Sequence, residues 1–248
     1  MTENNIIEIK DLSFAYGNES ILSHINCEIK DKELVSIVGP NGGGKTTLVR
    51  LMAGLLYPVK GKVYIEGVST TERHPIVGYV SQNSMIDDKF PVTVQDIVLS
   101  GTMKSGFGFY NKNDRKKANS ALESVGMSNF VKKRHSDLSG GQRKRVIIAR
   151  ALAGGAKILL LDEPTANLDA NSSADLIELI KDLNKTITVV LVTHDYGFVS
   201  DITNRVFCIN NHLHEHPLKE AEERFAMNLK RVDHTVVLNK CKGCEGKQ

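Results

Sequence analysis

The sequence predicts an α/β fold in which a parallel core sheet is joined by an antiparallel β subdomain and an inserted α-helical subdomain. Near-continuous Leu, Ile and Val runs alternate with segments of helical spacing, which is typical of parallel strands covered on both faces. Residues 6–30 instead alternate apolar and polar side chains, which indicates antiparallel strands. A stretch with only helical patterns, at about residues 84–140, predicts the insertion.

The composition is that of a globular protein with one large domain or two small ones. Of the 248 residues, 25% are charged and 41% hydrophobic, which excludes disorder, collagen and coiled coil. The formal charge of +3 is too small to indicate a nucleic-acid partner, so we expect none. No apolar run reaches the roughly 18 residues of a membrane span, and the polar start MTENNIIEIK does not resemble a signal peptide. We expect a cytosolic chain that reaches a membrane only through a partner.

The first part of the chain predicts strands followed by a strand, loop and helix. Apolar alternation predicts antiparallel strands at 6–17 and 21–30 around a turn, and a third strand at 33–39. A glycine-rich turn then leads into a helix at 45–54, which Gly54 can end.

The remainder alternates strands and helices on both sides of the helical insertion. We predict strands at 60–67, 76–82, 156–163 and 186–194, and helices at 92–101, 114–127, 140–155 and 174–185. The regular alternation fades near residue 212. The sequence therefore predicts one domain at residues 1–211 and a polar tail at 212–248.

The strongest motif is GPNGGGKT, which fits GxxxxGK[ST] and stands between a predicted strand and a predicted helix. Backbone N–H groups of such a loop form an anion cradle at the helix N-terminus. The lysine can reach the β and γ phosphates, and Thr46 can offer its hydroxyl to Mg²⁺. The predicted nucleotide-binding residues are Gly39, Pro40, Asn41, Gly42, Gly43, Gly44, Lys45, Thr46 and Thr47. The alternative is a glycine-rich turn that binds nothing.

An acidic pair follows the apolar run ILLL, at the end of a strand where ligands of parallel sheets gather. Asp162 is placed to hold Mg²⁺ through water, and Glu163 to orient and deprotonate the attacking water. Taken without the glycine-rich loop, the pair could instead cap a helix.

A third motif, LSGGQ at 138–142, heads the helix predicted at 140–155. With it the chain resembles the ATP-binding subunits of ABC transporters over about residues 6–210. The motifs stand in the family order: Tyr16, Gly39–Thr46, Gln82, LSGGQ, Asp162 with Glu163, NLD at Asn167–Asp169, and His194.

The resemblance implies roles for these positions. Two subunits bind head to tail, so the Ser139, Gly140, Gly141 and Gln142 segment of one chain contacts the γ-phosphate held by Lys45 of the other. Tyr16 would stack on adenine, Gln82 would bind Mg²⁺ and couple to the helical insertion, His194 would contact the γ-phosphate, and Asp169 would order the dimer interface. A simpler interpretation remains for each position. Tyr16 could be a half-buried strand residue and Gln82 a turn residue. His194 could be a structural hydrogen-bonding residue, and Asp169 a helix cap.

The resemblance also predicts the function. The runs at 87–101 and 121–134 look like the zinc/manganese uptake branch, so we expect an ATPase subunit, peripheral on the cytoplasmic face of the cell membrane. Permease subunits and, indirectly, an extracytoplasmic solute-binding protein are its expected partners. A siderophore or cobalamin importer subunit, a non-transport ABC ATPase and a nucleotide-sensing regulator are the alternatives. Gly43 departs from the Ser, Ala or Cys that the family often has, which predicts a more flexible loop without loss of activity.

The predicted tail holds a set of imidazoles and thiols that suits Zn²⁺. Alternate histidines in HLHEH share one face if the segment is extended, and a CxxC lies near the end of the chain. The candidate zinc ligands are His212, His214, His216, His234, Cys241 and Cys244. The alternative is a solvated tail with chance ligand residues. Cys27 and Cys208 lie in apolar alternation and are predicted to be buried.

Overall fold

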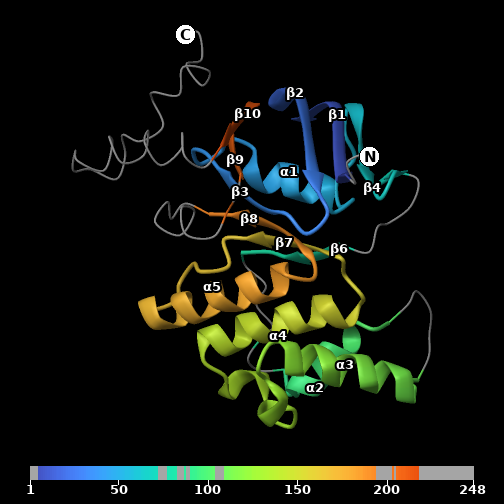
Figure 1. Cartoon of the computed structure of the whole chain (residues 1–248), viewed down its shortest axis with the longest axis vertical. Coiled ribbons are helices and arrows are strands. Elements are labelled where there is room, and N and C mark those ends of the chain that lie inside the picture. The colour runs from blue at the N-terminus through green and yellow to red at the C-terminus, as the bar shows by residue number, and fades with distance from the viewer. Residues whose placement is uncertain are drawn as a thin grey trace. The chain divides into compact units, whose positions relative to one another are not determined.

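The computed structural model describes residues 5–71, 77–82, 87, 90–103, 109–193, 203 and 205–217. The chain divides into two compact units (Figure 1). The first unit comprises Met1–Pro75 and Val190–Gln248, and the second comprises Ile76–Val189.

The first unit contains an antiparallel sheet with the strand order β2-β1-β4-β5. Its strands are β1 (Asn5–Tyr16), β2 (Glu19–Lys30), β4 (Lys60–Ile65) and β5 (Val68–Ser69). Ile9 pairs with Cys27 and Leu12 with Ile25, and all four side chains are buried. The alternation of apolar residues therefore places one face of this sheet in the core, which confirms the predicted antiparallel strands.

A second group of strands in the first unit leads to the glycine-rich loop. Strand β3 (Leu34–Val38), buried along its whole length, runs parallel to β9 (Arg205–Asn210). Strand β9 pairs with β10 (His212–Pro217) in antiparallel register. Helix α1 (Lys45–Met52) follows β3 through the loop. Regular structure thus extends over His212–Pro217, which the sequence analysis assigned to the polar tail.

The second unit combines parallel strands with helices. Strand β6 (Val77–Val80) runs parallel to β7 (Ile158–Asp162), which is buried at every position. Strand β8 (Thr188–Val192) begins beside β7, where the Thr188 N–H donates to the Lys157 carbonyl at 3.0 Å. Its last residues belong to the first unit, where the Thr193 N–H donates to the Ile37 carbonyl at 3.2 Å. These strands confirm the predicted parallel core.

The helical insertion is also confirmed. It includes α2 (Val94–Ser100), α3 (Lys112–Ser124) and the short 3₁₀ helices η1 (Ser128–Phe130) and η2 (His135–Asp137). Helix α4 (Gly140–Ala153) contacts α2, α3 and α5 (Ala170–Asn184) (Figure 1). Helices α2, α3 and α4 each begin with reciprocal cap bonds, in the pairs Thr93–Asp96, Asn111–Asp114 and Ser139–Gln142.

Candidate nucleotide-binding site

The glycine-rich segment Gly39–Thr46, here named the phosphate loop, joins β3 to α1 in the first unit. Gly44 has a φ of 100° and forms the N-terminal boundary of α1. A Cβ atom at Gly44 would lie 2.6 Å from Cδ2 of Leu22, and one at Gly39 would overlap the carbonyl oxygen of Ile209. Glycine is therefore required at both positions by space as well as by backbone conformation.

Gly43 lacks a Cβ for a packing reason, which differs from the flexibility predicted for it. A Cβ there would lie 2.8 Å from the Ile209 carbonyl oxygen and 3.1 Å from the Pro40 carbonyl oxygen. The Gly43 carbonyl accepts a hydrogen bond from the Asn211 N–H at 3.3 Å. The turn between β9 and β10 thus packs directly against the phosphate loop.

Lys45 lies inside its own loop. Its side-chain ammonium donates to the carbonyls of Gly39 at 3.0 Å and Pro40 at 2.8 Å, and the residue is only 6% exposed. The next residue, Thr46, is half-buried, and Thr47 in the first turn of α1 is buried. A cation within a loop that opens a helix is an arrangement suited to phosphate.

Tyr16 ends β1 with 48% of its surface exposed. Its ring meets Phe14 edge to face, with centroids 4.8 Å apart and an angle of 85° between the planes. This contact fixes one side of the ring, and the exposed remainder can take a further stacking partner.

In the second unit, β7 delivers two carboxylates at its C-terminal end. Asp162 is 3% exposed and accepts a long hydrogen bond from the Tyr79 hydroxyl at 3.4 Å. Glu163 follows with a φ of 51°, a left-handed conformation that is uncommon for a residue with a side chain. Such conformations gather at functional sites, where the surrounding structure holds them.

The side chain of Gln82 reaches Glu163 from the end of β6. Its Nε2 donates to Oε2 of Glu163 at 2.6 Å, across 81 positions of sequence. The resemblance gave Gln82 a role with Mg²⁺ but did not predict this contact. The amide of Gln82 is able to serve both Glu163 and Mg²⁺, because its NH₂ group donates to the carboxylate while the lone pairs of its oxygen can face a metal ion.

The signature segment Leu138–Gln142 is the N-terminal boundary of α4. The Ser139 hydroxyl accepts from the Gln142 N–H at 3.3 Å, and Gln142 Oε1 accepts from the Ser139 N–H at 3.2 Å. A Cβ at Gly140 would lie 3.1 Å from Leu168, and one at Gly141 would lie 3.3 Å from Ser172. Small residues here let α4 approach Leu168 and the first turn of α5.

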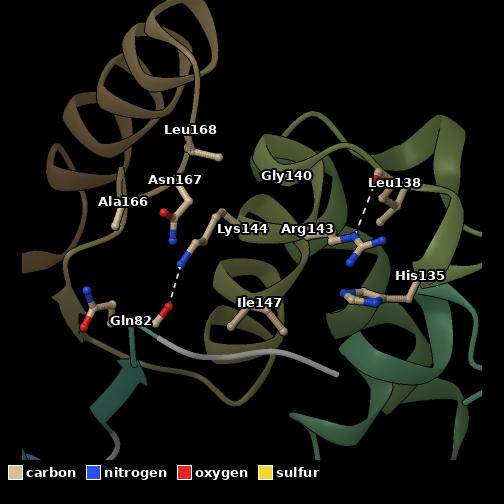
Figure 2. A pocket seen from close by; sticks show the side chains of 10 residues that line it. All are labelled: Gln82, His135, Leu138, Gly140, Arg143, Lys144, Ile147, Ala166, Asn167 and Leu168. Carbon is tan, nitrogen blue, oxygen red and sulfur yellow. Dashed lines mark hydrogen bonds between the residues drawn. The ribbon is translucent and has the colours of Figure 1, made fainter. Parts of the chain in front are cut away.

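A cavity of about 290 Å³ lies between these motifs in the second unit (Figure 2). The side chain of Lys144 points into it, and Nζ donates to the main-chain carbonyl of Gln82 at 3.1 Å. Burial lowers the pKa of Lys144, and the charge of Asp162 opposes this shift. No sequence motif marks this lysine. Its position three residues before Ile147 and four before Ile148, both buried, was the available sign that it faces the protein.

Asp169 caps α5, as the simpler interpretation predicted. Its carboxylate accepts from the Ser172 N–H at 2.9 Å and from the Ser172 hydroxyl at 2.7 Å, and these bonds lower its pKa. A role in a dimer interface stays a prediction.

The remaining candidates concern the proposed tail. His212, His214 and His216 lie at alternate positions of β10, and His212 Nδ1 lies 3.0 Å from the Ser23 carbonyl oxygen. Within the residues that the structure describes, no three His, Cys, Asp or Glu side chains are grouped so that they could hold a metal ion. His194, His234, Cys241 and Cys244 lie outside the described residues. Cys27 and Cys208 are buried, as predicted, and burial raises the pKa of Cys27 to about 12.

Among the residues described, none of the helices has both the length and the apolar character needed to cross a bilayer.

Comparison with known proteins identifies the family. The family model described as "ABC transporter" matches residues 22–166. A Chlamydia muridarum protein named "Probable metal transport system ATP-binding protein" is 42% identical over 218 residues, which cover 86% of this chain and 91% of that protein. The "Zinc uptake system ATP-binding protein ZurA" of Listeria innocua is 35% identical over 246 residues, covering 93% and 96%. The "Manganese transport system ATP-binding protein MntB" of Listeria monocytogenes is 38% identical over 214 residues, covering 85% and 89%.

A solved structure agrees with these relatives. It is described as the dimeric structure of MJ0796, a bacterial ABC transporter cassette, and is 30% identical with a TM-score of 0.72. The match covers 86% of this chain and 98% of that one. Since the family model spans more than half of the chain and the relatives align over nearly their whole length, the chain belongs to the ABC transporter family as one of its ATP-binding, ATP-hydrolysing subunits.

Proposed function

We propose that this chain hydrolyses ATP to power the import of a transition-metal ion, zinc or manganese, through membrane permease subunits. The names of the Listeria relatives support the choice of metals. The chain would sit on the cytoplasmic face of the cell membrane as a peripheral subunit. An extracytoplasmic solute-binding protein would deliver the ion to the permease.

The observation that best supports ATP hydrolysis at this site is the contact between Gln82 and Glu163 at the end of the buried strand β7. A general base must be held within hydrogen-bond reach of the proton it removes. The 2.6 Å bond from the Gln82 amide orients the Glu163 carboxylate. Glu163 is accordingly the proposed base that activates the attacking water.

The phosphate loop would bind the nucleotide. Lys45 would exchange its carbonyl contacts for the β and γ phosphates, with the loop N–H groups and the start of α1 adding to the field. Tyr16 would cover the adenine with its exposed ring face. His194, which lies outside the described residues, remains a proposed γ-phosphate contact.

Magnesium fits the donor chemistry of the proposed ligands. Thr46, Gln82 and Asp162 offer a hydroxyl, an amide and a carboxylate, and Mg²⁺ prefers such hard oxygen donors. When bound with ATP, the ion would neutralise charge that develops on the phosphates. Near-complete burial of Asp162 keeps its carboxylate at a fixed position at the end of β7.

A second copy of the chain is the proposed partner at the catalytic site. Ser139, Gly140, Gly141 and Gln142 would meet the γ-phosphate bound by the other copy, since N–H groups at the start of α4 attract anions. The MJ0796 cassette is described as dimeric, which supports this assembly. Asp169 would lie in the same interface.

Uptake measurements test the proposed substrate. In cells lacking this chain, uptake of radioactive zinc or manganese should fall, and the parent chain should restore it. The matched Glu163→Gln chain should not restore uptake, because it lacks the proposed base. Normal uptake of both metals in the deleted cells would contradict the proposal. Loss of siderophore or cobalamin uptake in the same cells would favour the alternative importer.

A further inference from the structure

Lys144 is a cation on the inward side of α4. It stands three and four residues before Ile147 and Ile148, which are 7% and 0% exposed, so it shares their face of the helix. Ammonium groups lose hydration when they are partly buried, and they are kept in such places where a polar group receives them. The receiving group of Lys144 is the main chain of Gln82.

The hydrogen bond of Lys144 joins helix α4 to the segment that follows β6. Nζ of Lys144 donates to the Gln82 carbonyl at 3.1 Å, and 62 positions separate the two residues in sequence (Figure 2). The side chain of the same glutamine donates to Glu163 at 2.6 Å. Gln82 is therefore held at its main chain by Lys144 and holds Glu163 by its side chain.

The other charged residue of the cavity is not placed to substitute for Lys144. Arg143 donates from Nε to the Leu138 carbonyl at 3.2 Å and from its guanidinium to the Ser136 carbonyl at 2.9 Å. These bonds bind Arg143 to the segment before α4, as Figure 2 shows for Leu138. Lys144 is instead directed at Gln82.

We propose that Lys144 is a positioning residue for ATP hydrolysis, which fixes Gln82 so that the glutamine amide orients the carboxylate of Glu163. The inference rests on the proposed role of Glu163 as base. It adds a link from α4, whose first residues form the signature segment, to the residue that activates water. A movement of α4 relative to β6 would loosen Gln82 and, through it, Glu163.

The physical effect of this link is on orientation. Displacement of a catalytic group by about 1 Å can lower a rate by about 10²-fold. Without the ammonium, Gln82 loses a hydrogen bond that holds its main chain directly after a strand. The phosphate loop is in the first unit, where Lys45 donates to the carbonyls of Gly39 and Pro40 within the loop itself. Loss of Lys144 should consequently affect the catalytic step more than nucleotide binding.

Substitution of Lys144 by methionine tests the proposal, since it removes the charge and keeps the unbranched stem. We expect Lys144→Met to lower kcat by about tenfold or more, with a change of less than about threefold in KM for ATP. Lys144→Arg keeps a cationic donor and should recover most of the rate. The control Lys117→Met, at an exposed position of α3, should behave like the parent.

A double-mutant cycle distinguishes action through Gln82 from general damage. In a Gln82→Ala background, Lys144→Met should cost little further kcat, because the amide that Lys144 positions is already absent. Hydrogen exchange of the nucleotide-free protein gives a readout independent of activity: the peptide that contains Gln82 should exchange faster in Lys144→Met than in Lys117→Met. Additive losses of kcat, or unchanged exchange at Gln82, would overturn the proposal.

The experiments distinguish failure of the proposed base, Glu163, from failure of the positioning role of Lys144. A Glu163→Gln protein with the parent turnover would remove Glu163 from the role of base, and the positioning role of Lys144 would fall with it. A Glu163→Gln protein that is inactive, together with a fully active Lys144→Met protein, would leave the base in place and overturn only the role of Lys144.

Discussion

At the scale of single residues, the space around the phosphate loop decides which side chains are tolerated. Gly39, Gly43 and Gly44 each face an atom that a Cβ would meet at less than 3.0 Å. At Gly39 and Gly43 that atom is the main-chain oxygen of Ile209, which cannot turn away as a side chain could. The loop is therefore fitted closely to β9.

Gly43 gives the clearest test of this fit. Gly43→Ala should destabilise the protein by about 1–3 kcal/mol, the usual range for overpacking, and should weaken ATP binding because the loop must shift. Denaturant unfolding and equilibrium binding of ATP would measure the two effects. A Gly43→Ala protein with the stability and affinity of the parent would support the original expectation of a flexible loop instead.

At the scale of secondary-structure elements, the sequence predicts those helices and strands whose apolar residues recur at a regular spacing. The strands and helices with strong apolar periodicity, such as β7 and α4, were found where expected. Strand β10 was not, because HLHEHP has only one aliphatic residue and its pairing is supplied by β9. The contacts of Gln82 with Glu163 and Lys144 join residues 81 and 62 positions apart, and no local pattern encodes such contacts.

Two substitutions at the N-terminus of α5 distinguish a helix cap from an interface role for Asp169. Asp169→Ala removes the acceptor for the Ser172 N–H and should lower the melting temperature, whereas Asp169→Asn keeps an acceptor and should not. If Asp169 also orders a dimer interface, Asp169→Asn should still lower ATPase activity. Thermal unfolding and turnover of both variants measure these effects. Full activity of Asp169→Asn would leave the helix cap as its one role.

Strand β10 and the residues beyond it carry the zinc prediction. Imidazole and thiolate bind Zn²⁺ after losing protons, so affinity should fall as the pH drops through about 6.5. A chain truncated after Pro217 keeps β10 with its three histidines, and a chain truncated after Asn211 loses them. We expect both to bind Zn²⁺ much more weakly than the full chain, since the described histidines do not form a metal site with their neighbours. Equilibrium dialysis measures this, and equal binding by all three chains would refute a zinc site in the tail.

At the scale of the whole molecule, the proposed mechanism needs two copies of the chain for one reaction. Because the signature segment of one chain would complete the site of the other, activity should rise faster than linearly with protein concentration. Ser139→Arg should block it, since a bulky cation would occupy the place of the γ-phosphate contact. Turnover measured over a range of concentrations tests this, and strict linearity for the parent would contradict a shared site.

In the proposed mechanism Glu163 activates the water that attacks ATP, and the turnover of Glu163→Gln decides whether it does so. The account predicts a loss of about 10² to 10⁴ in turnover, because the amide cannot accept the proton. ATP binding should be retained, since the substitution leaves Lys45 and the phosphate loop unchanged, and the ATP-bound protein should accumulate as a dimer in size-exclusion chromatography. Hydrolysis at nearly the parent rate by Glu163→Gln would contradict the account.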